Sequence, residues 1–143
     1  MPDDLTRDAL VAAVKRGVRV RVITPGPIID AEAVRGASRA SWGQLLEAGV
    51  QIHEYRSTMF HCKVLVADDL LVSVGSTNFD NRSFRLNDEA NLNIYDTDFA
   101  KQQVAIFEDD LKASNTVTLA EWQDRPLRER VMEHVASLLS SQL

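Results

Sequence analysis

Hydrophobic and polar positions repeat with two different periods along this chain, and the switches between them predict its elements. Residues 5–16 place apolar side chains at helical spacing and end at Gly17. Residues 18–24 instead alternate β-branched residues with arginines and stop at Pro25, which is typical of a strand. A helix followed by a strand indicates an α/β layered domain.

The next stretch predicts a second helix and a second strand. Residues 30–48 carry apolar side chains at helical spacing up to Gly49, which can end a helix in the left-handed conformation. Residues 50–55 then have the pattern of a strand. The order strand, helix, strand favours a crossover unit with parallel pairing.

Three short strands are expected in the middle of the chain. Residues 63–67 and 70–74 are apolar runs separated by Asp68 and Asp69, which is the signature of a tight hairpin. Residues 89–95 alternate again and predict a further strand. These strands extend the sheet of the expected α/β layered domain.

Helical spacing returns after these strands. Residues 96–111 form the expected helix, with Asp96 or Thr97 available as its N-cap. Residues 114–118 have the composition of a linker, and 118–122 that of a short helical turn.

The last segment, 126–143, is an amphipathic helix with Pro126 in its first turn. Packing against the core is the preferred interpretation of its apolar side, because its polar side carries both Glu and Arg. A surface for a partner is the alternative. His134 is expected at the edge of that packing.

Length and composition bound the class of protein. With 143 residues, 45% of them hydrophobic and 26% charged, the chain fits one folded domain, 1–143. The acidic start lacks the features of a signal peptide, and no apolar run approaches the ~20 residues of a membrane span. A soluble domain without a span of its own is expected.

Charge and cysteine content narrow the partners. The formal net charge of −5 argues against nonspecific binding of nucleic acid, although a local cationic pocket could hold one phosphate. The single cysteine, Cys62, cannot form an internal disulfide, and no zinc spacing surrounds it. On a strand it would point away from its neighbours His61 and Lys63, so it is expected to be buried.

The stretch from Met59 to Asn91 concentrates the side chains that carry chemistry. His61 and Lys63 lie two residues apart, so on a strand they share one face. An imidazole can attack phosphorus and form a phosphoenzyme. The ammonium of Lys63 could neutralise a phosphate oxygen, and Ser76 and Asn78 could donate hydrogen bonds to the others.

Such a histidine needs an acceptor on its second ring nitrogen, and Glu89 is the candidate. Asp68 lies beyond the strand and is better placed to order the hairpin. A structural explanation also exists, since a histidine and a lysine on a solvated strand edge, next to an ordinary GSTN turn, would give the same residues.

The combination resembles the phospholipase D superfamily. Its signature is H-x-K-x-x-x-x-D, then six residues, then G-S-x-N, and it is matched here by His61, Lys63, Asp68, Gly75, Ser76 and Asn78. The longer string GSTNFDNRSFRLNDEANL and the beginning PDDLTRDALVAAVKRGVRVRVITPG resemble bacterial cardiolipin synthases more narrowly. The resemblance spans nearly the whole chain.

The resemblance implies an α/β/α sandwich in which helices flank a mixed sheet. It also implies phosphatidyl transfer through a phosphohistidine, with neither a metal nor another cofactor. It implies a catalytic set of His61 as nucleophile or acid, Lys63, Asp68 and Glu89, the last partnering the histidine. It also implies that the substrate phosphate is bound by Lys63, Ser76 and Asn78. The implied substrate is a phospholipid similar to phosphatidylglycerol, and nucleic acid is not expected as a partner.

The chain departs from the family in having one motif where members use two that face each other. It therefore resembles a C-terminal half, and the second motif is expected from a homodimer mate or from a missing N-terminal half. Full-length relatives are expected to be membrane-associated, with this domain on the cytoplasmic side. A nuclease acting as a homodimer and a catalytically silent half-domain are the alternatives.

Overall fold

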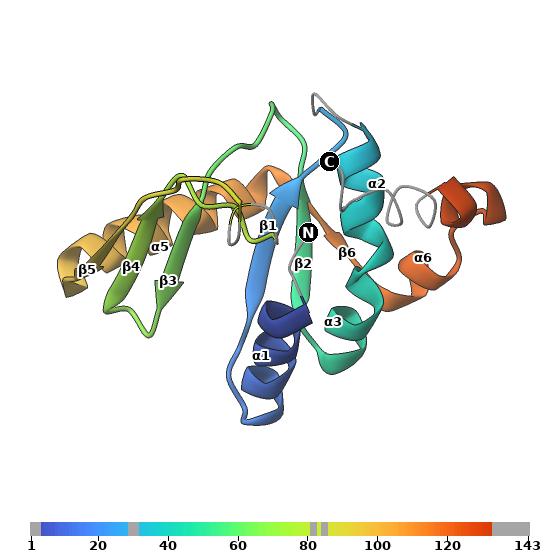
Figure 1. Cartoon of the computed structure of the whole chain (residues 1–143). Helices are drawn as coiled ribbons and strands as arrows, with labels where there is room; N and C mark the ends of the chain where they lie inside the picture. The colour runs from blue at the N-terminus through green and yellow to red at the C-terminus, as the bar shows by residue number, and fades with distance from the viewer. Residues whose placement is uncertain (1–3, 29–31, 81–82, 84–85, 133–143) are drawn as a thin grey trace.

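The structure is a computed structural model that describes residues 4–28, 32–80, 83 and 86–132 (Figure 1). Its helices are α1 (Asp4–Lys15), α2 (Glu32–Ala40), α3 (Trp42–Ala48), α5 (Thr97–Lys112) and α6 (Leu119–Gln123). Its strands are β1 (Arg21–Pro25), β2 (Gln51–Tyr55), β3 (Val64–Ala67), β4 (Leu71–Gly75), β5 (Asn91–Tyr95) and β6 (Ser114–Val117).

The strands form two sheets of three. In the first, ordered β1-β2-β6, β2 pairs in parallel with β1 and antiparallel with β6. In the second, ordered β3-β4-β5, both pairings are antiparallel. The predicted parallel crossover and the predicted hairpin are therefore confirmed. The strands are divided between two sheets, of which the first is mixed and the second is antiparallel.

Helices cover both faces of the first sheet. Arg21 and Val22 are neighbours on β1 and so point to opposite faces. Val22 packs against the buried cluster that includes α3, whereas Arg21 forms an ion pair of 2.7 Å with Glu108 of α5. Helix α5 also contacts β3 and β4, and it runs behind both sheets in Figure 1. The expected α/β/α layering is confirmed, with α5 joining the two sheets.

The apolar core lies between the first sheet and the helices α1, α3 and α6. Trp42, Leu45, Val50 and Ile52 form its buried cluster, each no more than 3% exposed. Its partly buried neighbours come from all three helices and from β1 and β6. The core thus belongs mainly to the half of the molecule that does not carry the motif.

Glycine and aspartate end and begin the helices as their chemistry predicts. Gly17 and Gly49 have φ of 92° and 97°, the left-handed conformation that costs glycine little. The side chain of Asp96 accepts hydrogen bonds from the N–H groups of Asp98 and Phe99, so Asp96 is the N-cap of α5.

The hairpin turn also follows from local chemistry. Asp68 and Asp69 have φ of 54° and 52°, as a two-residue turn with the twist of the flanking strands requires. The N–H of Leu70 donates to the carbonyl of Ala67 at 3.1 Å and closes the turn. Aspartate tolerates this conformation better than most residues.

Two predictions about the elements were wrong. The single helix expected over 30–48 is divided into α2 and α3 at Ser41, whose N–H and hydroxyl both donate to the carbonyl of Ser38. Such local bonds compete with the helical ladder. The linker expected over 114–118 is instead strand β6, because its backbone pairs with β2 despite its polar side chains.

The C-terminal helix differs from expectation where it is described. Residues 127–132 are helical, yet Leu127, Val131 and Met132 are 75%, 60% and 66% exposed. The prediction that this helix packs on the core is therefore wrong for residues 127–132. The rest of the predicted helix, including His134, lies outside the described residues.

Candidate functional site

Three segments of the motif meet at one end of the second sheet. Because β3 and β4 are antiparallel, the start of β3 lies beside the end of β4. The N–H of Gly75 donates to the carbonyl of Lys63 at 3.3 Å, and the N–H of Ser76 donates to the carbonyl of Ala90 at 3.1 Å. The strand pairing therefore brings Lys63, Ser76 and the Glu89 segment together.

Gly75 permits the closest of these approaches. A Cβ at this position would collide with the carbonyl oxygen of Ala90 and the side-chain oxygen of Asn91, and it would lie 2.7 Å from the Cα of Asn91. Neither backbone atom can move without disturbing β5. The glycine is required so that the GSTN segment can lie against β5.

His61, Cys62 and Lys63 precede the first strand of the hairpin, which begins only at Val64. His61 is exposed, and Lys63 is half-buried with its ammonium donating to the carbonyl of His61 at 3.1 Å. Cys62 is exposed as well. The prediction that Cys62 is a buried hydrophobe is wrong, since these residues are not part of the strand whose alternation would have buried it.

Ser76 and Asn78 use part of their hydrogen-bonding capacity inside the protein. The hydroxyl of Ser76 accepts the N–H of Ala90 at 3.1 Å, and its own proton is directed to the carboxylate of Glu89. The side chain of Asn78 is exposed, while its carbonyl accepts the N–H of Asp80 at 2.9 Å. The side-chain amide of Asn78 is therefore exposed to a ligand, whereas the hydroxyl of Ser76 is shared with Glu89.

Glu89 lies at the centre of the polar contacts. Its Oε1 accepts the hydroxyl of Ser83 at 3.1 Å and the side-chain amide of Asn87 at 3.2 Å. The pKa of Glu89 is lowered from its ordinary value of 4.5, first by the hydroxyl of Ser76, then by Asn87 and Ser83, and by the charge of Lys63. Glu89 is held as a carboxylate beside the motif lysine.

The structure brings Lys63, Ser76 and Glu89 together, and its geometry differs from the expectation at His61 and at Asp68. No hydrogen bond joins the imidazole of His61 to Glu89, both of which are described. Asp68 lies in the hairpin turn, five residues and roughly 16 Å of strand away from Lys63. Asp68 therefore orders the turn and does not share the end of the sheet with the other motif residues.

Sequence reasoning assigned no role to Ser83 and Asn87, which hold Glu89. Ser83 is only 4% exposed, and its N–H donates to the side chain of Asp80 at 2.8 Å. An aspartate three residues before a serine is a turn-forming arrangement, and that spacing was the available signal.

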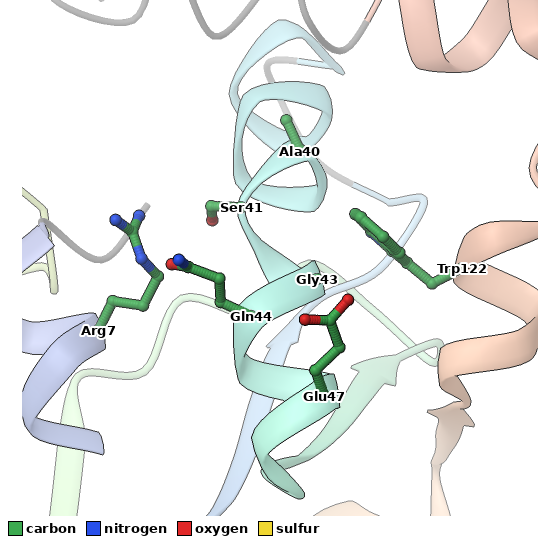
Figure 2. Close-up of a pocket in the computed structure, with 7 residues that line it drawn as sticks. All are labelled: Arg7, Ala40, Ser41, Gly43, Gln44, Glu47 and Trp122. Carbon is green, nitrogen blue, oxygen red and sulfur yellow. The ribbon is translucent and has the colours of Figure 1, made fainter. Parts of the chain in front are cut away.

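A surface cavity of about 350 Å³ lies elsewhere, between α1, α3 and α6 (Figure 2). Arg7, Gln44, Glu47 and Trp122 are among its lining residues, and no residue of the motif lines it. The cavity therefore does not mark the candidate site.

Two features of the described ranges concern a membrane and a metal ion. Within them, no helix combines the length and the apolar character needed to cross a membrane. In the same ranges, no group of three or more His, Cys, Asp or Glu side chains is arranged to hold a metal ion. Metal-free chemistry remains a prediction.

The fold is similar to that of a phospholipase D family member, Nuc from Salmonella typhimurium. The TM-score is 0.73 at 23% identity, covering 82% of this chain and 76% of that chain. NucT from Helicobacter pylori gives a TM-score of 0.61 at 19% identity, covering 81% and 76%. These likenesses define the class of fold.

Sequence comparison identifies the family. Residues 1–111 match the family described as "Cardiolipin synthase, PLD-like domain", and the chain belongs to that family. It is 42% identical over 140 residues to "Cardiolipin synthase" of Geobacillus sp. (strain WCH70), covering 98% of this chain and 28% of that protein.

A second relative has a similar identity to the chain and a similar coverage. The chain is 41% identical over 140 residues to "Major cardiolipin synthase ClsA" of Bacillus subtilis (strain 168), covering 98% of this chain and 29% of that protein. The chain thus spans less than a third of the length of these relatives.

Proposed function

We propose that this chain supplies one half of a phosphatidyl-transfer site of the cardiolipin synthase type. The observation that carries the proposal is the convergence of the motif residues at one end of the second sheet, with Glu89 held as a carboxylate beside Lys63. The relatives that are about 40% identical bear the name cardiolipin synthase, which supports the same class of reaction.

His61 is the nucleophile in the proposed reaction. Its imidazole forms a nitrogen–phosphorus bond while the bond from phosphorus to the departing alcohol oxygen breaks, and that oxygen takes a proton from a second histidine. A hydroxyl of another phospholipid then attacks phosphorus, returns a proton to the second histidine and releases His61. With phosphatidylglycerol as both donor and acceptor, the products are cardiolipin and glycerol.

Lys63, Ser76 and Asn78 bind the phosphate in this scheme. The ammonium of Lys63 opposes the charge of the non-bridging oxygens, and the two polar side chains donate to them as charge develops. The bond from Lys63 to the carbonyl of His61 keeps the ammonium next to the nucleophile. Glu89 accepts the second ring proton of His61 once the site is assembled.

The second histidine has to come from a second motif. Apolar side chains around the motif support a covering partner, because Met59, Val64, Phe79 and Leu92 are 45%, 40%, 44% and 62% exposed. We propose that this surface receives either a second copy of the chain or an N-terminal half that carries its own motif. A catalytically silent half would result if neither is available.

The experiment measures conversion of phosphatidylglycerol to cardiolipin and glycerol by the purified chain, alone and after mixing with the N-terminal half of a relative. His61→Ala should abolish turnover while the circular dichroism spectrum is unchanged. The neighbouring Cys62→Ser is the matched control and should retain turnover.

Three results would contradict the proposal. They are turnover by His61→Ala, loss of turnover on adding a chelator, and cleavage of single-stranded DNA in preference to the lipid. Failure of both preparations to trap a phosphorus label on His61 would favour the silent half-domain.

A further inference from the structure

Ser83 is the buried polar side chain among the described residues, and its position next to Glu89 calls for a reason. A buried hydroxyl is stable only when it is hydrogen-bonded. Its proton is given to Oε1 of Glu89 at 3.1 Å. The serine thus directs its single donor at a carboxylate of the candidate site.

We propose that Ser83 is the positioning residue that holds the carboxylate of Glu89 in its working orientation. The inference rests on the proposed function in one respect, since it assigns Glu89 to the histidine. It goes beyond that function by naming a buried residue outside the signature that holds the carboxylate in place.

The backbone of Ser83 is itself fixed, which makes it a suitable support. Its N–H donates to Oδ1 of Asp80 at 2.8 Å, and the N–H of Asp80 donates to the carbonyl of Asn78 at 2.9 Å. The chain of bonds begins in the GSTN segment and ends at Glu89. Bonds among Asn78, Asp80, Ser83 and Glu89 therefore link the phosphate-binding segment to the carboxylate.

The bonding pattern at Glu89 explains what this support achieves. Ser83 and Asn87 both donate to Oε1, and the hydroxyl of Ser76 also interacts with this carboxylate. Fixing Oε1 orients Oε2, and because each carboxylate oxygen has two lone pairs, Oε2 can accept a hydrogen bond from an imidazole even beside Ser76. Asn87 is exposed, whereas Ser83 is shielded from water, so Ser83 is the firmer of the two supports.

The electrostatics agree with this geometry. The hydroxyl of Ser76 lowers the pKa of Glu89 most, the amide of Asn87 less, and the hydroxyl of Ser83 adds a smaller effect in the same direction. A carboxylate that accepts several donors stays ionised when it must hold a positively charged imidazole.

The test follows the carboxyl signal of Glu89 by carbon-detected NMR during a pH titration of the whole chain. Ser83→Ala should raise the pKa of Glu89 toward 4.5, and Ser83→Thr, which keeps the hydroxyl, should leave it low. Ser114→Ala is the matched control, because its partly buried hydroxyl donates to the carbonyl of Asp110 at 2.8 Å, away from the site. It should leave the pKa of Glu89 unchanged.

Ser83→Cys covers the case in which the alanine variant does not fold. Its side chain has nearly the same shape and is a weaker donor, so it should raise the pKa of Glu89 as well. An unchanged Glu89 pKa in both Ser83→Ala and Ser83→Cys would overturn the proposal.

Kinetics of the active assembly provide the second measurement. Ser83→Ala should lower kcat about tenfold with little change in KM, and it should move the acid limb of the pH profile upward. Ser83→Thr should restore both.

The two proposals fail in different ways. A wild-type protein without turnover whose Glu89 pKa still depends on Ser83 would contradict the proposed function and keep the positioning role. Normal turnover and an unshifted acid limb of the pH profile in Ser83→Ala would contradict the positioning role and keep the proposed function.

Discussion

At the scale of single residues, two positions have environments that only folding creates. His53 on β2 has Nδ1 within 3.1 Å of the hydroxyl of Thr116, while its Nε2 is buried with no partner among the described residues. Gly75 has no room for a side chain, because Ala90 and Asn91 lie against it. Neither property could be read from residue type.

The stability of the protein should depend on the protonation of His53. Burial, and then the charge of Arg21, lower the pKa of His53 from 6.5, so protons bind the unfolded chain first as the pH falls. The free energy of unfolding that neutral His53 contributes is fully present above pH 6.5, and it is lost as the pH decreases below 6.5. Arg21, the charge that acts on the ring, also forms an ion pair with Glu108.

The measurement is urea unfolding above and below pH 6.5. His53→Gln should flatten the loss of unfolding free energy between these conditions, because the titrating group is gone. An equally steep loss in His53→Gln would show that other groups cause it.

Replacement of Gly75 by alanine should destabilise the motif end of the second sheet. The added Cβ collides with backbone atoms, so we expect a cost at the upper end of about 1–3 kcal/mol. Gly17→Ala is the control, because its φ is 92° and a Cβ there meets nothing within 4 Å, so only conformational strain of about 1 kcal/mol is expected. Equal costs in chemical denaturation would contradict the steric explanation.

At the scale of elements, the turn between β3 and β4 shows how local chemistry fixes a register. Asp68 and Asp69 both adopt positive φ, and the antiparallel pairing then sets Val64 opposite Val74. This register is what brings Lys63 to Gly75 at the other end. The turn thus determines the geometry of a site at the far end of the hairpin.

Asp69→Gly should stabilise the hairpin. Glycine adopts positive φ without a steric cost and is preferred at the second position of such turns, so we expect a gain of about 0.5–1 kcal/mol. Asp69→Asn is the control for the removal of charge, and its gain should be smaller. Thermal unfolding of the three proteins distinguishes the two contributions, and a greater gain from asparagine would contradict the conformational argument.

At the scale of the whole molecule, the buried apolar side chains are unevenly divided. Trp42, Leu45, Val50 and Ile52 lie around the first sheet, whereas the second sheet has Val72 and its α5 neighbour Ala100. The motif is therefore carried by the half with the smaller core. Helix α5 is the element that ties this half to the rest.

Amide hydrogen exchange should reflect this division. We expect the amides of β2 to exchange more slowly than those of β5, because opening the first sheet exposes the larger core. If a second copy covers the motif, exchange in β5 should slow further as the protein concentration rises. Equal protection of β2 and β5 at low concentration would contradict the uneven core.

The sequence by itself determined the elements whose signals are local. Gly49, Asp96 and the Asp68–Asp69 turn were readable because caps and tight turns depend on neighbouring residues. The spacing of His61, Lys63, Ser76 and Asn78 predicted the family, which the comparisons confirm.

Tertiary structure alone decided the rest. The polar segment 114–118 became a strand because β2 offered it an edge, and Cys62 stayed exposed because the strand begins after it. The contact between Ser83 and Glu89 joins residues six apart through a loop whose path no periodicity encodes. Pairing and burial depend on what the rest of the chain places nearby, and local sequence cannot specify that.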